Sequence, residues 1–183
     1  MAGLRIIAGD WRGRKMTVPK GEATRPTADR TRETLFNMLT SRLGAFNDLR
    51  VADLFAGSGA LGLEALSRGA AHCIFVEQDR AAVDAIRANI SALDARNRSD
   101  VRQTSVMTLP AAQQPLDLIL LDPPYDTGAG AVALDRMLRL GWIGPDTWMA
   151  VETAGHEEVT VKGLSLEKER RVGKAKLHLL RQA

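Results

Sequence analysis

The glycine-rich stretch at residues 51–62, VADLFAGSGALG, constrains the fold more than any other part of the chain. A short apolar run containing Asp53 is followed by Gly57, Gly59 and Gly62, which lead into an amphipathic segment. This order predicts a strand, a tight turn and the start of a helix, where a ligand can approach bare backbone. Glycine suits the turn because a side chain would block that approach and because φ can be positive there.

The rest of the chain alternates between predicted strands and predicted helices. Strands are expected at residues 51–55, 72–77, 101–104, 116–121 and 148–152, and helices at 60–68, 79–93 and 131–140. Such alternation predicts an α/β fold with a parallel sheet covered by helices on both faces. The tail differs: residues 159–162, 164–171 and 174–180 have strand character without room for crossover helices. At least the last two are expected to form an antiparallel hairpin at the sheet edge, turning near Gly173.

The first 50 residues carry a net charge of +5, and the remaining residues carry −2. Residues 4–8 and 14–18 are expected to form a hairpin with Trp11 at its tip, followed by a helix from about Pro26 to Gly44. Clustered arginines beside an aromatic ring suit RNA, because phosphates take the charge and a base can stack on the ring. Alternatively, Trp11 caps the core, and both interpretations stay open. The candidate RNA-binding residues are Arg5, Trp11, Arg12, Arg14, Lys15, Arg25 and Arg30.

The glycine turn matches the dinucleotide pattern GxGxxG, and Glu77 follows Gly57 by 20 positions. An acidic residue at the end of the second strand accepts hydrogen bonds from an adenosine ribose. This pattern alone fits NAD, FAD or S-adenosylmethionine. Asp53 favours the last, because its carboxylate would repel a pyrophosphate but attract a sulfonium or ammonium. The chain length agrees, since a nicotinamide enzyme usually needs a further substrate domain.

The segment Asp122-Pro123-Pro124-Tyr125 directly follows the apolar strand at residues 116–121. Ligands of open α/β sheets bind beyond the carboxyl ends of the strands, so this tetrapeptide should face the same crevice as the glycine turn. The Asp122 carboxylate and the Pro123 carbonyl would accept the two hydrogens of an exocyclic amino group, while Tyr125 stacks on the planar base. Holding the amine in this way would aim its lone pair at an electrophilic methyl group, after the base leaves its stack.

At these motifs the chain resembles the class I S-adenosylmethionine-dependent amino-methyltransferases. It resembles most closely the bacterial small-subunit (16S) ribosomal RNA guanine-N2 methyltransferases, the RsmD family. The strings that carry the resemblance are LRIIAGDWRGRKMTVP, TRPTADRTRETLFNML, DLFAGSGALGLEALSRGA, VEQD and LDPPY.

The resemblance implies a Rossmann-like fold with a seven-stranded, mostly parallel sheet, an antiparallel C-terminal hairpin, and an N-terminal β-hairpin and helix. Residues 1–44 would form the RNA-binding extension and residues 45–183 the methyltransferase domain. The expected substrate is small-subunit RNA, within an assembling ribosomal particle. The resemblance also implies these site residues: Asp53, Phe55, Ala56, Gly57, Gly59, Glu77 and Asp122 for S-adenosylmethionine, and Asp122, Pro123 and Tyr125 for catalysis.

Two positions depart from the family pattern. Ser105 stands where this class often has an acidic residue or asparagine near the adenine, and Val172 stands where an aromatic residue is expected. We further expect a cytoplasmic enzyme that acts as a monomer. The single cysteine, Cys73, is expected as a buried thiol, and neither a signal peptide nor a membrane-spanning run is expected. No metal site is expected, because the three histidines are scattered along the chain.

Three alternatives remain open on the sequence. The same chemistry could act on adenine N6 in DNA or on a glutamine amide of a protein. The chain could instead be an RNA-binding assembly factor that keeps the fold without turnover. A nicotinamide oxidoreductase is the third.

Overall fold

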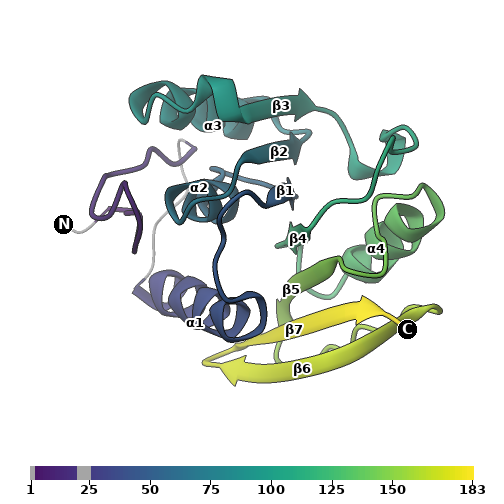
Figure 1. The fold of residues 1–183 in the computed structure, drawn as a ribbon. Helices are drawn as coiled ribbons and strands as arrows, with labels where there is room; N and C mark the ends of the chain where they lie inside the picture. Colours follow the sequence, from purple (N-terminus) through teal and green to yellow (C-terminus); the bar gives the residue numbers. More distant parts are fainter. Residues whose placement is uncertain (1–2, 20–25) are drawn as a thin grey trace.

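The computed structural model describes residues 3–19 and 26–183, so the predicted RNA contact at Arg25 lies outside the described residues. Figure 1 shows a central sheet flanked by helices. The helices are α1 (Pro26–Leu43), α2 (Ala60–Ser67), α3 (Arg80–Ala92) and α4 (Ala129–Arg139), with short 3-10 turns η1 (Arg96–Arg98) and η2 (Val106–Thr108). The strands are β1 (Arg50–Leu54), β2 (His72–Glu77), β3 (Ser99–Gln103), β4 (Leu118–Leu121), β5 (Trp148–Ala154), β6 (Leu164–Val172) and β7 (Ala175–Gln182).

The seven strands form one sheet in the order β3-β2-β1-β4-β5-β7-β6. The first five are parallel, and β7 runs antiparallel to both β5 and β6. The order reverses direction between β1 and β4, which is where ligands bind in open α/β sheets. The predicted seven-stranded sheet with an antiparallel C-terminal hairpin is therefore confirmed.

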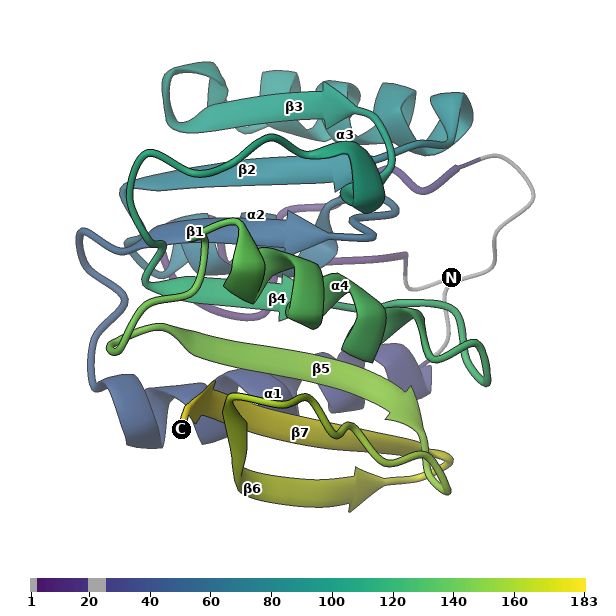
Figure 2. The same cartoon turned by 90° about the vertical axis from the view of Figure 1, so that its right-hand side faces the viewer.

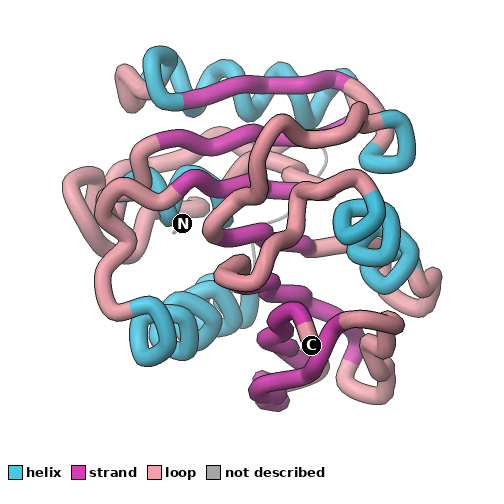
Figure 3. Tube along the Cα trace, turned by 45° about the vertical axis from the view of Figure 1, so that its right-hand side comes forward, coloured by secondary structure: helices cyan, strands magenta, loops and turns pink. Residues whose placement is uncertain are grey.

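Two hydrophobic cores fill the two faces of the sheet. On one face, α1, α2, α3 and the N-terminal segment pack together, and Leu4, Phe36 and Leu63 belong to the same buried cluster. On the other face, α4 and the loops before β5 and β6 cover Ile119 and Val151. Figure 2 shows α4 in front of the strands and α1 behind them, and Figure 3 shows helices on both sides of the sheet. The two cores explain why strand residues alternate between the clusters.

The expected strand at residues 159–162 is wrong, because this segment is an extended loop and turn before β6. Val159 and Val161 are both buried in the α4-side core. Their alternation therefore reflects packing of a loop against the sheet face, without strand pairing. A period of two reports which side chains are buried, and it does not by itself require a partner strand.

The expected N-terminal hairpin is much less regular than two full strands. Its arms run antiparallel, but they form a single β-bridge, between Arg5 and Lys15. The amides of Ile7 and Ala8 donate instead to a side chain of α2, and the amide of Thr17 donates to a side chain of α3. These donors are satisfied by side chains of α2 and α3. The hairpin therefore does not need a longer ladder of hydrogen bonds between its two arms.

None of the helices in the described ranges is both long enough and apolar enough to cross a membrane.

Candidate active site

Four residues lie in a row across the carboxyl ends of neighbouring strands. In the sheet register, Leu54 lies beside Val76 on one side and Leu121 on the other. Leu121 in turn lies beside Val151. The next residue of each strand or strand end therefore stands at the same level across the sheet. We call this set the strand-end row: Glu77, Phe55, Asp122 and Glu152.

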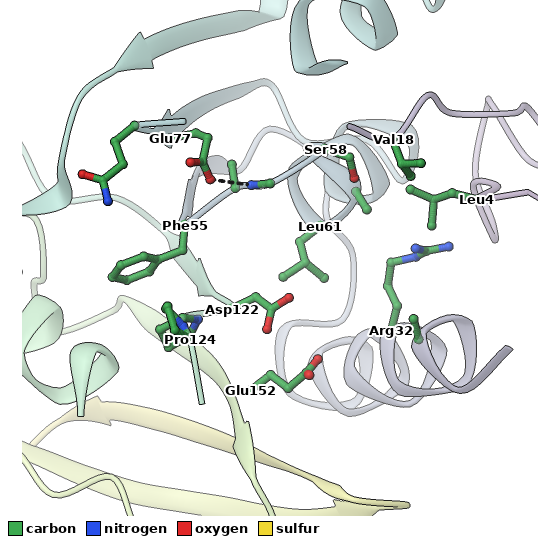
Figure 4. A pocket seen from close by; sticks show the side chains of 16 residues that line it. Leu4, Val18, Arg32, Phe55, Ser58, Leu61, Glu77, Asp122, Pro124 and Glu152 are labelled. Carbon is green, nitrogen blue, oxygen red and sulfur yellow. Dashed lines mark hydrogen bonds between the residues drawn. The ribbon is translucent and has the colours of Figure 1, made fainter. Parts of the chain in front are cut away.

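The strand-end row forms part of the wall of a pocket of about 510 Å³ (Figure 4). The glycine turn, the start of α1 and the N-terminal segment supply the remaining walls. The switch point of the sheet therefore holds a cavity large enough for a small organic ligand. The other lining residues are Leu4, Val18, Ala28, Arg32, Ala56, Gly57, Ser58, Ala60, Leu61, Gln78, Pro123 and Pro124.

The turn between β1 and α2 has a strained backbone. Phe55 has φ +58°, which a bulky residue rarely adopts, and Gly57 and Gly59 have φ +58° and +84°. A Cβ on Gly57 would meet no atom within 4 Å, so this glycine presents bare backbone to the pocket. Gly62 serves a different purpose, because its Cβ would lie 2.5 Å from the Phe75 ring. The first two glycines shape the turn, and Gly62 lets α2 pack closely on β2.

Asp53 lies beneath the glycine turn and does not line the pocket. The side chain is 1% exposed, and its Oδ2 accepts a hydrogen bond from the Gly62 amide at 2.9 Å. Burial raises the pKa of Asp53 well above its usual range, whereas this hydrogen bond acts in the opposite direction. Its Oδ1 has no hydrogen-bond partner among the described residues. A buried acceptor of this kind calls for a donor or a cation.

Glu77 is placed where the sequence predicts it, on the pocket wall at the end of β2. One carboxylate oxygen accepts from the Gly57 amide at 2.9 Å (Figure 4), and the other accepts from the Asp79 amide at 2.8 Å. These bonds tie the glycine turn to the start of α3. Each oxygen retains a second lone pair, so the carboxylate can still accept ribose hydroxyl hydrogens.

Asp122 and Glu152 face the same pocket from β4 and β5 (Figure 4). The surrounding protein removes part of the water around Asp122, and this desolvation, with the nearby Glu152 charge, raises the pKa of Asp122 to about 8. The Asp122 side chain opens onto the pocket, so it remains accessible to a ligand. Burial likewise raises the pKa of Glu152, against a hydrogen bond from Tyr125. Neither carboxylate forms an ion pair with any cation in the described ranges.

The loop that follows β4 is fastened to the end of β5 and the turn after it. The Tyr125 hydroxyl donates to Glu152 Oε2 at 2.7 Å, and the exposed Tyr125 ring is not among the residues that line the pocket. The Asp126 amide donates to Glu157, and His156 hydrogen-bonds the Asp126 carboxylate. Glu152 was missed by the sequence analysis, since one acidic residue in an apolar strand carries no motif. Only the register identifies it.

These hydrogen bonds bring together Asp126, His156 and Glu157. The atoms of these side chains that could bind a metal ion all lie within 4.8 Å of one another. The sequence analysis treated the histidines as scattered, and for His156 that description is incomplete. The three side chains lie at the surface or only partly buried, and their hydrogen bonds already account for the arrangement.

Arg32 lines the pocket, but its charge is used inside the protein. Its side chain is 4% exposed and lies 3.7 Å from the fully buried Glu64. Glu64 also accepts from the amides of Ile7 and Ala8 and pairs with Arg68 at 2.9 Å. The anions beside Arg32 are therefore Glu64 of α2 and, at 3.3 Å, Asp29 of its own helix.

The N-terminal segment, which carries the basic residues, runs along α2 from the pocket towards the far end of that helix. Leu4 and Val18 line the pocket, whereas the Asp10 and Trp11 amides donate to Ser67 at the end of α2. The Trp11 ring packs partly against the core, with the Arg98 guanidinium 5.4 Å from its centre. The structure thus places Trp11 as the core-capping alternative describes. The side chains of Arg5, Arg12, Arg14, Lys15 and Arg30 are exposed.

Two remaining expectations concern single residues. Ser105 caps η2, with its hydroxyl accepting from the Met107 amide at 3.1 Å, so it is committed to the local turn. Cys73 is a buried free thiol, as predicted.

Comparison with known proteins identifies the family. The chain matches the family described as "Conserved hypothetical protein 95" over residues 4–181. The chain belongs to this family. It is 40% identical over 150 residues to "Ribosomal RNA small subunit methyltransferase D" of Escherichia coli K12, covering 82% of this chain and 74% of that protein. The protein of the same name from Haemophilus influenzae is 36% identical, with coverages of 93% and 89%. The RsmD resemblance is confirmed.

Solved structures agree with the family. The fold superposes on yhhF of Escherichia coli with a TM-score of 0.84 and 36% identity, covering 99% of this chain and 98% of that one. A magnesium protoporphyrin IX methyltransferase with bound SAM superposes with a TM-score of 0.67 over 89% of this chain. At 14% identity, that likeness establishes the class I methyltransferase fold alone.

Proposed function

We propose that this member of the family transfers a methyl group from S-adenosylmethionine to the exocyclic N2 of a guanine in small-subunit ribosomal RNA. The observation that carries the proposal is the DPPY segment, whose Asp122, Pro123 and Pro124 line the same pocket as the glycine turn. The names of the relatives support a ribosomal RNA substrate. An RNA substrate would place the reaction in the cytoplasm, and residues 1–44 would contribute to RNA binding.

The residues of the pocket fit S-adenosylmethionine. Gly57 offers bare backbone and open space, which a Cβ would fill. The carboxylates of Glu77 and Asp122 on the pocket wall suit a ligand that carries a sulfonium and an ammonium, and the orphaned Oδ1 of Asp53 lies beneath the glycine turn. We assign Asp53, Phe55, Ala56, Gly57 and Gly59 to the methionine part and Glu77 to the ribose. When bound, S-adenosylmethionine supplies an electrophilic methyl group.

The chain's own residues would act by positioning. Asp122 and the Pro123 carbonyl accept the two N2 hydrogens, so that the nitrogen lone pair points into the pocket. Tyr125 stacks on the base, held by its hydrogen bond to Glu152. N2 gains a methyl group and loses one proton. Because the pKa of Asp122 is raised to about 8, its carboxylate is a better proton acceptor than an ordinary aspartate.

The experiment is methyl transfer from tritiated S-adenosylmethionine to small-subunit particles purified from a strain that lacks the gene, followed by nucleoside analysis. Label in N2-methylguanosine is expected with the wild-type chain and not with Asp122→Ala. Label on adenine N6 or in protein would reject the proposal in favour of those substrates. A folded wild-type chain that binds particles without transferring label would indicate an assembly factor.

A further inference from the structure

We propose that Glu152 determines the choice of base by accepting the N1–H hydrogen of the target guanine. This inference rests on the proposed function, because it concerns the base whose N2 is methylated. It assigns a specificity role to a β5 residue that belongs to neither the glycine turn nor the DPPY segment.

Glu152 stands beside Asp122 at the ends of two neighbouring strands. Both follow the registered pair Leu121 and Val151, so they stand at the same level on neighbouring strands. Neighbouring strands lie about 4.8 Å apart, and residues at one level project to the same face. Figure 4 shows both side chains directed into the pocket. A base whose amine reaches Asp122 therefore presents the adjoining part of its edge to Glu152.

One carboxylate oxygen of Glu152 is held by a hydrogen bond, and the other is available to a ligand. Oε2 accepts the Tyr125 hydroxyl at 2.7 Å, which fixes the carboxylate. Oε1 makes no hydrogen bond to any residue in the described ranges. It is also not one of the buried side-chain polar atoms that lack a partner, so a ligand can reach it. The charge of Glu152 is also unpaired within those ranges, since Arg32, which lines the same pocket, pairs with Glu64 and Asp29.

The bases differ in the hydrogen-bonding group that lies next to their exocyclic amine. Guanine carries a ring N–H donor, N1–H, next to its exocyclic amine. Adenine and cytosine carry a ring nitrogen acceptor next to theirs. A carboxylate acceptor beside the amine site attracts the first arrangement and repels the other two. Glu152 thus selects guanine, while Asp122 and Pro123 hold the amine that all three bases possess.

The test uses 2-aminopurine, which has the same exocyclic amine but a ring acceptor at N1. Reconstituted small-subunit particles would carry either guanine or 2-aminopurine at the methylated position, and kcat/KM would be measured for both. The wild-type chain should prefer guanine by roughly 10- to 100-fold, the range for a hydrogen bond to a charged group. In Glu152→Gln the amide can donate to N1 of 2-aminopurine, so the preference should fall at least about tenfold.

Comparing variants on the same two bases cancels their intrinsic difference in reactivity. Glu152→Gln keeps the size of the side chain and removes repulsion with Asp122, so it should fold; Glu152→Ala provides a second variant, with a similar loss of preference. Glu167→Gln, an exposed β6 carboxylate bonded only to Ser165 in the described ranges, is the matched control and should behave as wild type. Calorimetry with S-adenosylmethionine should give the same affinity for all four chains.

An unchanged base preference in Glu152→Gln, or loss of methylation on both bases by both Glu152 variants, would overturn the proposal. Weaker S-adenosylmethionine binding in those variants would overturn it too, by assigning Glu152 to the cofactor. Absence of label at guanine N2 with the wild-type chain is a separate result, which would reject the proposed function itself.

Discussion

Asp122 and Glu152 stand side by side at the ends of β4 and β5, facing one pocket, and no cation of the described residues forms an ion pair with either. Two neighbouring carboxylates that lose water raise each other's affinity for protons. They are therefore poised to accept hydrogen bonds from the N–H groups of a ligand. The register of β4 and β5 therefore sets the protonation chemistry of the pocket.

Asp122→Asn should alter both activity and its pH dependence. In the wild-type chain the pKa of Asp122 is raised to about 8, so the carboxylate needed as an acceptor forms only as the pH approaches that value. We expect kcat/KM, at subsaturating S-adenosylmethionine, to rise up to about pH 8 and then level. A bound cation should move this rising limb of the pH profile to lower pH. Asp122→Asn should lower kcat/KM roughly 100-fold and remove the limb. A limb that persists in the variant would contradict this assignment.

The same substitution should stabilise the protein at high pH. An acid whose pKa is higher in the folded state than in the unfolded state destabilises the fold progressively as the pH rises between the two values, here from 3.8 to about 8. The gain in Tm from Asp122→Asn should therefore be small near pH 4, grow with pH and level above about 8. Thermal unfolding across this range measures it. A gain that is independent of pH would contradict the raised pKa.

Gly57→Ala should impair cofactor binding more than folding. Gly57 has φ +58° and open space where a Cβ would lie. Gly173, in the turn between β6 and β7, has the same φ and the same open space, which makes Gly173→Ala a matched control. Each substitution should cost about 1 kcal/mol of stability through backbone strain. Only Gly57→Ala should weaken S-adenosylmethionine binding, by roughly tenfold or more, because the added methyl group enters the pocket.

Calorimetry with S-adenosylmethionine measures that difference, and urea unfolding confirms equal strain. Equal affinities in the two variants would show that the cofactor does not approach Gly57.

Glu64→Ala should strongly destabilise the protein and release the N-terminal segment. The fully buried Glu64 carboxylate accepts from the Ile7 and Ala8 amides and interacts with Arg32 and Arg68. Its removal leaves the Ile7 and Ala8 amides without an acceptor and takes the nearby negative charge from Arg32 and Arg68, at a cost of about 3–5 kcal/mol. Urea unfolding measures the loss, and amide exchange at Ile7 and Ala8 should accelerate.

Glu33→Ala, at an exposed position of α1, is the control and should change stability by less than about 0.5 kcal/mol. If Glu64→Ala were equally mild, Glu64 would not anchor the N-terminal segment.

Arg12→Ala should weaken RNA binding and lower its salt dependence. The Arg12 side chain is exposed at the turn that docks near the end of α2. The eight residues of α2 separate this turn from the pocket by about 12 Å, so Arg12 would contact RNA beyond the target base. Losing one phosphate contact should reduce the slope of log K against log salt by about 0.7–0.9. Filter binding to small-subunit RNA at several salt concentrations measures the slope.

Arg139→Ala is the matched control, because Arg139 is 76% exposed on α4, across the sheet, and its charge pairs with Asp135. The slope should not change in this variant. An unchanged slope in Arg12→Ala as well would mean that the Arg12 charge only faces solvent.

Much of the fold was predictable because its signals are local. The glycine pattern at residues 57–62, the apolar strands and the helix periodicities each report on a few neighbouring residues. The errors arose where a local pattern has more than one structural explanation. Val159 and Val161 alternate as in a strand but pack as a loop. The N-terminal arms resemble full strands, but their donors bond to Glu64 and Asn89.

The sequence by itself determined the order of strands and helices, the glycine turn, Glu77 at a strand end and Asp122 after a buried strand. These features follow from backbone geometry and burial along a short stretch of chain. Only the tertiary structure decided which distant residues meet: Glu152 beside Asp122, Tyr125 on Glu152, and Arg32 on Glu64. The reason is that strand register and helix docking bring together residues with no fixed spacing in sequence, and their pairing becomes defined only when the sheet assembles.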